Sequence, residues 1–356
     1  MIFHNKLGSL KEKLKRMDNL SQILKADLDF SNIEFDDFKR AIELCKNDLV
    51  SAVVREFPTL QGTMGYYYSN IAGIKNTISE AIKEHYKPYG PNDICPQSKV
   101  SKALAILDKM DTIAGFFSIK EEPSSSKDPF ALRRAGLGII RIIIEGKFSI
   151  NLSNLIKKSL DAYSENINLL DIKNEKNRYE IYNKIQSFIL ERYENLIKDN
   201  DKLKIYIFKS INVDKNNLNI LVINKYCELI NEFVNSNEGN DFLVAYKRVL
   251  NILESNGESE STKSNENIDI KLFKTAEEKK LYHEISKIIK SGIFQKLSQI
   301  SYLSSFTQPI NNFFDNVQIN EKNILLKNNR ICLLSLLKDK LNHIVDFSKI
   351  IKGKEL

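Results

Sequence analysis

Apolar residues recur every three or four positions along almost the whole chain, and this spacing limits the possible folds more than any other feature of the sequence. Such spacing places apolar side chains on one face of a helix. The clearest stripes are Ile71, Ile74, Ile78 and Ile82, then Tyr182, Ile185, Ile189, Tyr193 and Leu196, and near the end Leu333, Leu336 and Leu337. Only residues 204–211 (KIYIFKSI) offer a serious strand candidate, and helical stretches flank them. The periodicity therefore predicts an all-α fold.

Proline and a change of composition mark where helices and modules end. A stripe from Phe38 to Phe57 predicts one helix that ends at Pro58, because proline lacks a backbone N–H and disfavours a helical residue before it. Six of the seven prolines precede residue 130, whereas the chain beyond about residue 145 is rich in Ile, Asn and Lys. Residues 254–267 (ESNGESESTKSNEN) contain no apolar residue and predict a flexible surface loop. These changes indicate more than one module.

The formal charge of +7 is unevenly distributed. Residues 1–150 carry a net +3, residues 151–265 a net −1 and residues 266–356 a net +5. Excess positive charge in a C-terminal module is typical of nucleic-acid binding, although lysine-rich chains without that function also carry such an excess. No run of 18 or more apolar residues exists, which argues against a membrane span, and the N-terminus has no signal-peptide pattern. Four scattered cysteines without a CxxC pair favour a reducing, cytoplasmic setting.

Candidate metal ligands and nucleophiles are few. Asp48, His85 and Asp111 fall on three predicted helices and could converge, as ligands do in helical metal-dependent phosphohydrolases of the HD type. Those enzymes need an adjacent His-Asp pair, which this chain lacks, so a structural role is the favoured interpretation and no metal site is predicted. GxSxG, GxGxxG and the phosphate-binding GxxxxGKS or GxxxxGKT patterns are also missing. We therefore expect no catalytic residue in this chain.

Two basic segments have the chemistry to bind phosphate groups. In the first, Asp128 predicts the cap of a helix that opens at Pro129, and Arg133, Arg134 and Arg141 follow on it. Ion pairing with carboxylates is the favoured interpretation of these arginines, and phosphate binding is the alternative.

The second basic segment lies near the end of the chain. Phe313 and Phe314, close to Asn316, precede Lys327 and Arg330. Aromatic rings and amides together can stack on unpaired bases and hydrogen-bond to them. The favoured interpretation of the two phenylalanines is that they pack in the hydrophobic core. For Lys327 and Arg330, RNA binding and a structural role both stay open.

At these same segments the chain resembles the β subunit of the bacterial heterotetrameric glycyl-tRNA synthetase. The resemblance covers nearly the whole chain in the right order. It rests above all on EFPTLQGTMG (56–65), SKDPFALRR (126–134), AYKRVLNIL (245–253) and FFDNV (313–317). The first two strings are highly specific. The matched part corresponds to the C-terminal half of that subunit.

The resemblance implies three regions and a division of labour. Residues 1–145 would form an HD-like helical domain without metal ligands, residues 146–239 a helical connecting body, and residues 240–356 an anticodon-binding helical bundle similar to that of arginyl-tRNA synthetase. In this family a separate α subunit activates glycine with ATP and Mg²⁺ and transfers it to tRNA, while the β subunit supplies most tRNA binding. The expected partners are therefore the α subunit of a heterotetramer and the tRNA for glycine, and this chain itself is expected to bind no cofactor.

Residue type and position then predict the contacts. The expected anticodon-side contacts are Lys247, Arg248, Asn316, Lys327 and Arg330. The expected contacts to the acceptor side of the tRNA or to the α subunit are Lys127, Arg133, Arg134 and Arg141. Two alternatives from other classes stay open: a metal-dependent phosphohydrolase built on residues 1–145, and an interface scaffold that does not touch RNA.

Overall fold

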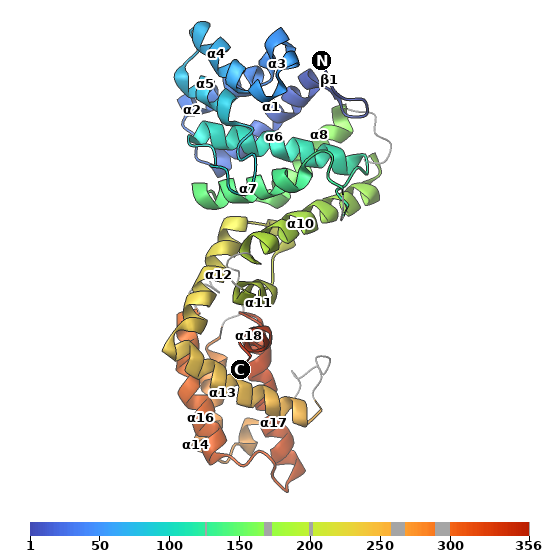
Figure 1. Cartoon of the computed structure of the whole chain (residues 1–356). Coiled ribbons are helices and arrows are strands. Elements are labelled where there is room, and N and C mark those ends of the chain that lie inside the picture. The colour runs from blue at the N-terminus through green and yellow to red at the C-terminus, as the bar shows by residue number, and fades with distance from the viewer. Residues whose placement is uncertain (125–126, 167–172, 199–201, 258–267, 289–299, 356) are drawn as a thin grey trace. The chain divides into compact units, whose positions relative to one another are not determined.

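A computed structural model describes residues 1–124, 127–166, 173–198, 202–257, 268–288 and 300–355, and Figure 1 shows its course. Within these residues the regular secondary structure is helical apart from one short hairpin, in which β1 (Ile2–His4) pairs antiparallel with β2 (Gly8–Ser9). The all-α prediction is confirmed. None of the described helices combines the length and the apolar composition that crossing a lipid bilayer requires.

The described chain divides into two compact units. Unit 1 comprises Met1–Leu196 and Asp214–Asn224, and unit 2 comprises Ile197–Val213 and Lys225–Leu356. Residues 146–239, predicted as a separate connecting body, are shared between the units. The reason is that α8 (Leu152–Asn166) packs on helices of unit 1, whereas α11 (Lys202–Ser210) packs on the last helix of unit 2.

Unit 1 is built around one central helix, α6 (Lys99–Ser118), almost all of whose side chains are buried. The other helices that the structure describes here are α1 (Leu10–Asp27), α2 (Asn32–Leu44), α3 (Ala52–Glu56), α4 (Thr63–Ile71), α5 (Asn76–Glu84), α7 (Leu132–Gly146), α8 and most of α10 (Glu175–Lys198), with short 3₁₀ turns at Asn47–Val50, Pro58–Leu60 and Lys215–Asn217. Helix α6 contacts α1, α2, α5, α7 and α8. A residue on α6 is therefore placed to meet side chains from most of unit 1.

Unit 2 contains α11, most of α12 (Ile220–Asn235), α13 (Asn237–Ser255), α14 (Ala276–Ser286), α16 (Thr307–Asn316), α17 (Ile324–Asn342) and α18 (Phe347–Gly353), with 3₁₀ turns at Ile270–Leu272 and Ile300–Phe306. Helix α13 contacts α16, α17 and α18, and its apolar face carries Phe242, Tyr246 and Val249 into the core. Three helices of the described chain begin with a full capping box, in which a Ser or Thr and a Glu three residues later satisfy the first free N–H groups: Ser9 with Glu12, Ser31 with Glu34, and Thr275 with Glu278.

Three local predictions need correction, and the strand candidate, which the all-α prediction did not adopt, is helical. The strand candidate 204–211 lies in helix α11 up to Ser210, because packing against α18 decides its conformation. The single helix predicted from Phe38 to Phe57 is broken after Leu44, and Phe57 is 57% exposed.

The other two corrections concern helix and loop boundaries. Helix α7 begins at Leu132 and not at Pro129, although Asp128 does cap it, accepting hydrogen bonds from the backbone N–H groups of Leu132 (2.8 Å) and Arg133 (3.0 Å). The loop predicted over 254–267 begins later, since α13 extends to Ser255, and its residues 258–267 lie outside the described part of the chain.

Candidate functional site

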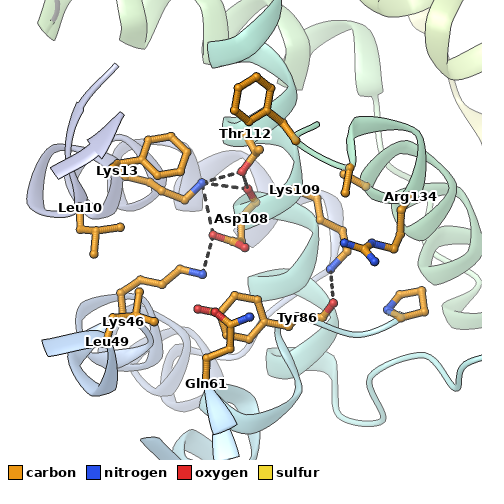
Figure 2. Close-up of a pocket in the computed structure, with 15 residues that line it drawn as sticks. Leu10, Lys13, Lys46, Leu49, Gln61, Tyr86, Asp108, Lys109, Thr112 and Arg134 are labelled. Atoms are coloured by element: carbon orange, nitrogen blue, oxygen red, sulfur yellow. Dashed lines mark hydrogen bonds and ion pairs between the residues drawn. The ribbon is translucent and has the colours of Figure 1, made fainter. Parts of the chain in front are cut away.

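A buried carboxylate and two lysines form the centre of unit 1. Asp108, on α6, lies 3.3 Å from the Lys13 ammonium of α1 and 3.0 Å from the Lys46 ammonium that follows α2 (Figure 2). Burial opposes the ionisation of Asp108, but Lys13 and Lys46 outweigh it and hold the pKa of this carboxyl well below its usual range. The same pairing keeps Lys46 charged, because Asp108 raises its pKa against the effect of burial.

One turn along α6, Asp111 binds a second set of cations. Its carboxylate accepts hydrogen bonds from Arg16 Nε (2.7 Å) and Nη2 (3.2 Å) and from Lys13 Nζ (3.1 Å). The Arg16 guanidinium also lies over the Tyr163 ring, 3.9 Å from its centroid, and donates to the Tyr163 hydroxyl (2.9 Å). This network joins α1, α6 and α8, so Asp111 is a structural residue that holds three helices together.

His85, at the end of α5, is fully buried and bound on both ring nitrogens. Because the Lys46 ammonium can only donate, Nε2 of His85 accepts from it at 2.8 Å, and Nδ1 donates to the Ile82 carbonyl at 2.7 Å. Burial and the Lys46 charge lower the pKa of His85 well below its ordinary value. The ring is therefore neutral and positions Lys46.

Asp48 closes the turn that contains the specific string 56–65. Its Oδ2 accepts hydrogen bonds from the backbone N–H of Gly62 (2.6 Å) and of Gly65 (3.2 Å), at the start of α4. Gly62 has φ of +77°, and a Cβ on Gly65 would lie 2.6 Å from Ile82 Cγ2. Both glycines are thus required by backbone geometry and by close packing. The string that carries much of the family resemblance is a structural turn.

The three residues considered as metal ligands do not converge on one point. Asp48 binds backbone amides, His85 binds Lys46, and Asp111 binds Arg16 and Lys13. In the described part of the chain, no group of three or more His, Cys, Asp or Glu side chains is arranged to hold a metal ion. Ammonium and guanidinium groups surround Asp111, and backbone N–H groups bind Asp48.

Around Asp108 lies a cavity of about 310 Å³, which we call the Asp108 cavity. Its charged lining consists of Lys13, Lys46, Lys109, Arg134 and Asp108. Lys109 donates to the carbonyl oxygens of His85 (3.0 Å), Tyr86 (3.3 Å) and Lys87 (2.7 Å), and burial lowers its pKa to about 8. Of the residues in and around this cavity, the sequence did not predict Lys13, Arg16, Lys46, Asp108 or Lys109. The one indication in the sequence was that these charged residues occupy positions where the helical spacing would place buried apolar side chains.

The four basic residues predicted around α7 have different environments. Arg141 is engaged within the fold, since it pairs with Glu145 (2.9 Å) and donates to the Gly90 and Pro91 carbonyls. Arg133 donates to the Ser124 carbonyl. Lys127 is exposed, and so is Arg134, whose guanidinium has no hydrogen bond or ion pair to any described residue. Ion pairing, the favoured interpretation, thus holds for Arg141, while Lys127 and Arg134 are accessible to a ligand.

In unit 2, α13, α17 and α18 line a groove of about 1160 Å³, which we call the C-terminal groove. Four lysines and four carboxylates line it: Lys247, Lys338, Lys349, Lys352, Glu254, Asp339, Asp346 and Glu355. Between them stand the amides of Asn251 and Asn342 and the hydroxyls of Ser335 and Ser348. The groove therefore offers a balanced set of hydrogen-bond donors and acceptors and no large excess of either charge.

The remaining predicted contacts of unit 2 lie on α13, α16 and α17. Arg248 lies over the Phe314 ring, 4.6 Å from its centroid, and pairs with Asp315 (3.2 Å). Asn316, the last residue of α16, is exposed, and Lys327 is partly exposed in the first turn of α17. Phe313 is fully buried, as its core interpretation predicted.

Arg330 does not lie where an RNA contact would need it. Its side chain is only 5% exposed, its Nε donates to Glu278 Oε1 at 2.8 Å and its Nη1 to the Gln318 carbonyl at 2.8 Å. This burial corrects the expectation that Arg330 binds RNA. The residue joins α17 to α14, because a buried guanidinium needs a carboxylate partner.

Comparisons with known proteins agree with this division. A family model described as "Glycyl-tRNA synthetase beta subunit" matches residues 1–211, and one described as "DALR anticodon binding domain" matches residues 242–350. The first match covers most of unit 1, and the second lies within unit 2 and contains most of the C-terminal groove. The resemblance inferred from the sequence is confirmed.

Curated relatives give the same result. The chain is 37% identical over 98% of its length to the glycine–tRNA ligase beta subunit of Rickettsia typhi, covering 49% of that protein. It is 34% identical over 99% of its length to the corresponding subunit of Oenococcus oeni, covering 50%, and 39% identical over 94% to that of Rickettsia prowazekii, covering 46%. The chain thus spans about half the length of the curated relatives it matches.

Proposed function

This chain belongs to the family of glycyl-tRNA synthetase beta subunits, and we propose that it is the tRNA-binding half of such a subunit. In this role it supports the charging of tRNA with glycine and carries out no catalytic step itself. The observation that carries the proposal is the coincidence of the anticodon-binding family match, residues 242–350, with the C-terminal groove.

The chemistry of the C-terminal groove suits unpaired bases. Anticodon bases are unstacked, so their edges are accessible to amides, hydroxyls and carboxylates, which the edges of duplex RNA are not. Asn251, Ser335 and Asn342 supply neutral donors and acceptors. Lys247 and Lys338 can neutralise the phosphates next to those bases, which makes binding depend on salt concentration.

The partner and cofactors follow from the same proposal. The name of the relatives, a beta subunit, supports an α subunit as partner, and we propose that the two assemble as a heterotetramer in the cytoplasm. ATP and Mg²⁺ would be used by the holoenzyme at the α subunit. On unit 1, Lys127 and Arg134 are the exposed candidates among the residues expected to contact the acceptor side of the tRNA or the α subunit.

The test is binding of glycine tRNA to the full chain, measured by filter binding at several salt concentrations. The double variant Lys247→Gln/Lys338→Gln should weaken binding at least about tenfold and reduce the salt slope by about one for each phosphate that is no longer neutralised. Asn316→Ala should weaken binding without changing that slope. Lys280→Gln, on the exposed surface of α14 outside the C-terminal groove, is the matched control and should leave the affinity within about twofold.

Equal affinities of the groove variant and the Lys280 control would contradict the proposal. A chain that copurifies with the α subunit but binds no tRNA would be a scaffold. Release of phosphate from nucleotides with added Mn²⁺, abolished by His85→Ala, would support the phosphohydrolase alternative, which the binding of His85 to Lys46 does not favour.

A further inference from the structure

The Asp108 cavity carries charge that the fold leaves uncompensated. Four cations line it, Lys13, Lys46, Lys109 and Arg134, against the single carboxylate of Asp108. Including the neighbouring pair of Asp111 and Arg16 does not change this excess of three positive charges, since they contribute one of each sign. Concentrated, partly desolvated positive charge is the condition under which an anion binds strongly.

The hydrogen bonds within the cavity show which groups remain available for a ligand. The Lys13 ammonium has three donors and three close acceptors, the Asp108 carbonyl (3.1 Å), Asp111 Oδ2 (3.1 Å) and Thr112 Oγ1 (2.9 Å). Lys109 likewise donates to three carbonyl oxygens. These two lysines supply charge at a fixed position but have no donor left.

Three other groups can donate to a ligand. The Lys46 ammonium is bound to His85 Nε2 and to Asp108, and its third N–H is engaged by the Tyr86 side chain, whose ring centroid lies 4.0 Å away. A phosphate that binds Lys46 would replace this neutral partner with a charged one, which forms the stronger hydrogen bond. The Arg134 guanidinium and the Gln61 side-chain amide have no hydrogen bond to any residue that the structure describes. Figure 2 shows Arg134 reaching toward the cavity from the side opposite Lys46, with Gln61 below. A phosphate between them would meet donors from three directions.

Aromatic side chains also line the cavity, beside its cations. Phe3, Tyr86 and Phe130 line it, and all three are partly exposed. Phe130 is stacked on Phe116, with centroids 3.8 Å apart, so its ring is held in place. Fixed aromatic rings beside cations bind nucleobases next to their phosphates. The volume of about 310 Å³ is at the lower end for ligand sites and fits one nucleotide.

We propose that the Asp108 cavity binds a free nucleoside monophosphate, with the phosphate held by Arg134, Lys46 and Gln61 and the base against Phe130 and Phe3. Lys13 and Lys46 are only 2% and 5% exposed, which places them out of reach of an RNA backbone on the surface, whereas Arg134 on the same cavity is exposed. This site is separate from the proposed anticodon contacts in unit 2 and does not depend on them.

The test is isothermal titration calorimetry of the full chain with AMP, GMP, CMP and UMP, and with adenosine and inorganic phosphate as partial ligands. At least one monophosphate should bind about tenfold more tightly than inorganic phosphate, and adenosine should bind more weakly than AMP. Arg134→Gln should weaken nucleotide binding about tenfold. Arg134 is exposed, so this variant is expected to fold like the natural chain, which thermal unfolding checks.

The matched control is Arg40→Gln, which removes an exposed arginine that pairs with Glu43 on the surface of α2 and should leave binding within about twofold. Phe130→Leu should weaken the nucleotide and leave inorganic phosphate unchanged. The proposal is overturned if no monophosphate binds at millimolar concentration, if Arg134→Gln and Arg40→Gln bind equally, or if inorganic phosphate binds as tightly as the nucleotides. It is also overturned if a short single-stranded RNA displaces the nucleotide with higher affinity, since the site would then belong to RNA.

Discussion

Replacing Arg330 by methionine should destabilise unit 2 and leave the surface of the C-terminal groove intact. The side chains of Arg330 and Glu278 are 5% and 1% exposed, and their hydrogen bond of 2.8 Å joins α17 to α14. Methionine fills a similar volume with apolar atoms but leaves the Glu278 carboxylate buried without its cation.

The magnitude follows from what Glu278 retains. Removing one partner of a buried ion pair costs about 3–5 kcal/mol. Glu278 keeps hydrogen bonds from the backbone N–H of Lys274 (2.7 Å) and Thr275 (2.8 Å), so we expect the lower end, about 3 kcal/mol. The double variant Arg330→Met/Glu278→Gln removes the charge on both sides and should recover most of this loss.

The pH dependence has a definite sign. Burial raises the pKa of Glu278, but the hydrogen bonds from Arg330 and from the Thr275 and Lys274 amides outweigh burial and lower it from its usual 4.5. A lowered pKa means that the stabilisation is present above pH 4.5 and is lost as the pH falls through the folded-state value. The stability difference between Arg330→Met and the natural chain should therefore shrink below about pH 4.5.

The measurement is guanidinium unfolding followed by circular dichroism, with hydrogen exchange on α14 and α17 to locate the change in unit 2. Binding of glycine tRNA is measured on the folded variants. The reasoning is refuted if Arg330→Met is as stable as the natural chain and yet loses tRNA affinity, because Arg330 would then act at the surface and not inside the fold.

Two further predictions concern unit 1 and the cysteines. Gly65→Ala should destabilise the chain by about 1–3 kcal/mol, because the added Cβ would lie 2.6 Å from Ile82 Cγ2. Gly90→Ala is the control and should be neutral, since no atom lies within 4 Å of the position of its Cβ. Thermal unfolding compares the two variants, and equal effects would contradict the packing argument. Burial raises the pKa of Cys45 to about 12, so at pH 8 about one thiol in ten thousand is ionised, and a thiol reagent should modify the partly exposed Cys332 long before Cys45. Mass spectrometry of the modified peptides checks this order, and early modification of Cys45 would show that unit 1 opens readily.

Local pattern predicted helices well where one face is buried against a neighbour. The stripe from Tyr182 to Leu196 lies in α10 as expected, with Ile185, Ile189 and Tyr193 buried. The pattern failed between Leu44 and Pro58, where apolar spacing continues through one 3₁₀ turn and a short helix. Spacing alone cannot distinguish a continuous helix from successive short ones, since both place apolar residues three or four positions apart.

Side-chain roles were predictable where they depend on neighbours in the sequence. Asp128 caps α7, because a carboxylate just before a helix can reach its free N–H groups wherever the helix lies. Arg330 and Lys327 are both basic and lie three positions apart, yet one is buried on Glu278 and the other is partly exposed. The difference comes from a carboxylate 52 positions away in the chain.

The sequence by itself determined the helical fold class, the family and the absence of a His-Asp pair, because these depend on periodicity and on short specific strings. Only the tertiary structure decided which charges meet. Lys13, Lys46 and Asp108 come from three segments far apart in the chain, and inside unit 1 both ammonium groups pair with the Asp108 carboxylate. Packing of α1 and α2 against α6 brings them together, and burial then makes their pairing strong. No spacing along the chain encodes that meeting, since it arises when the helices pack.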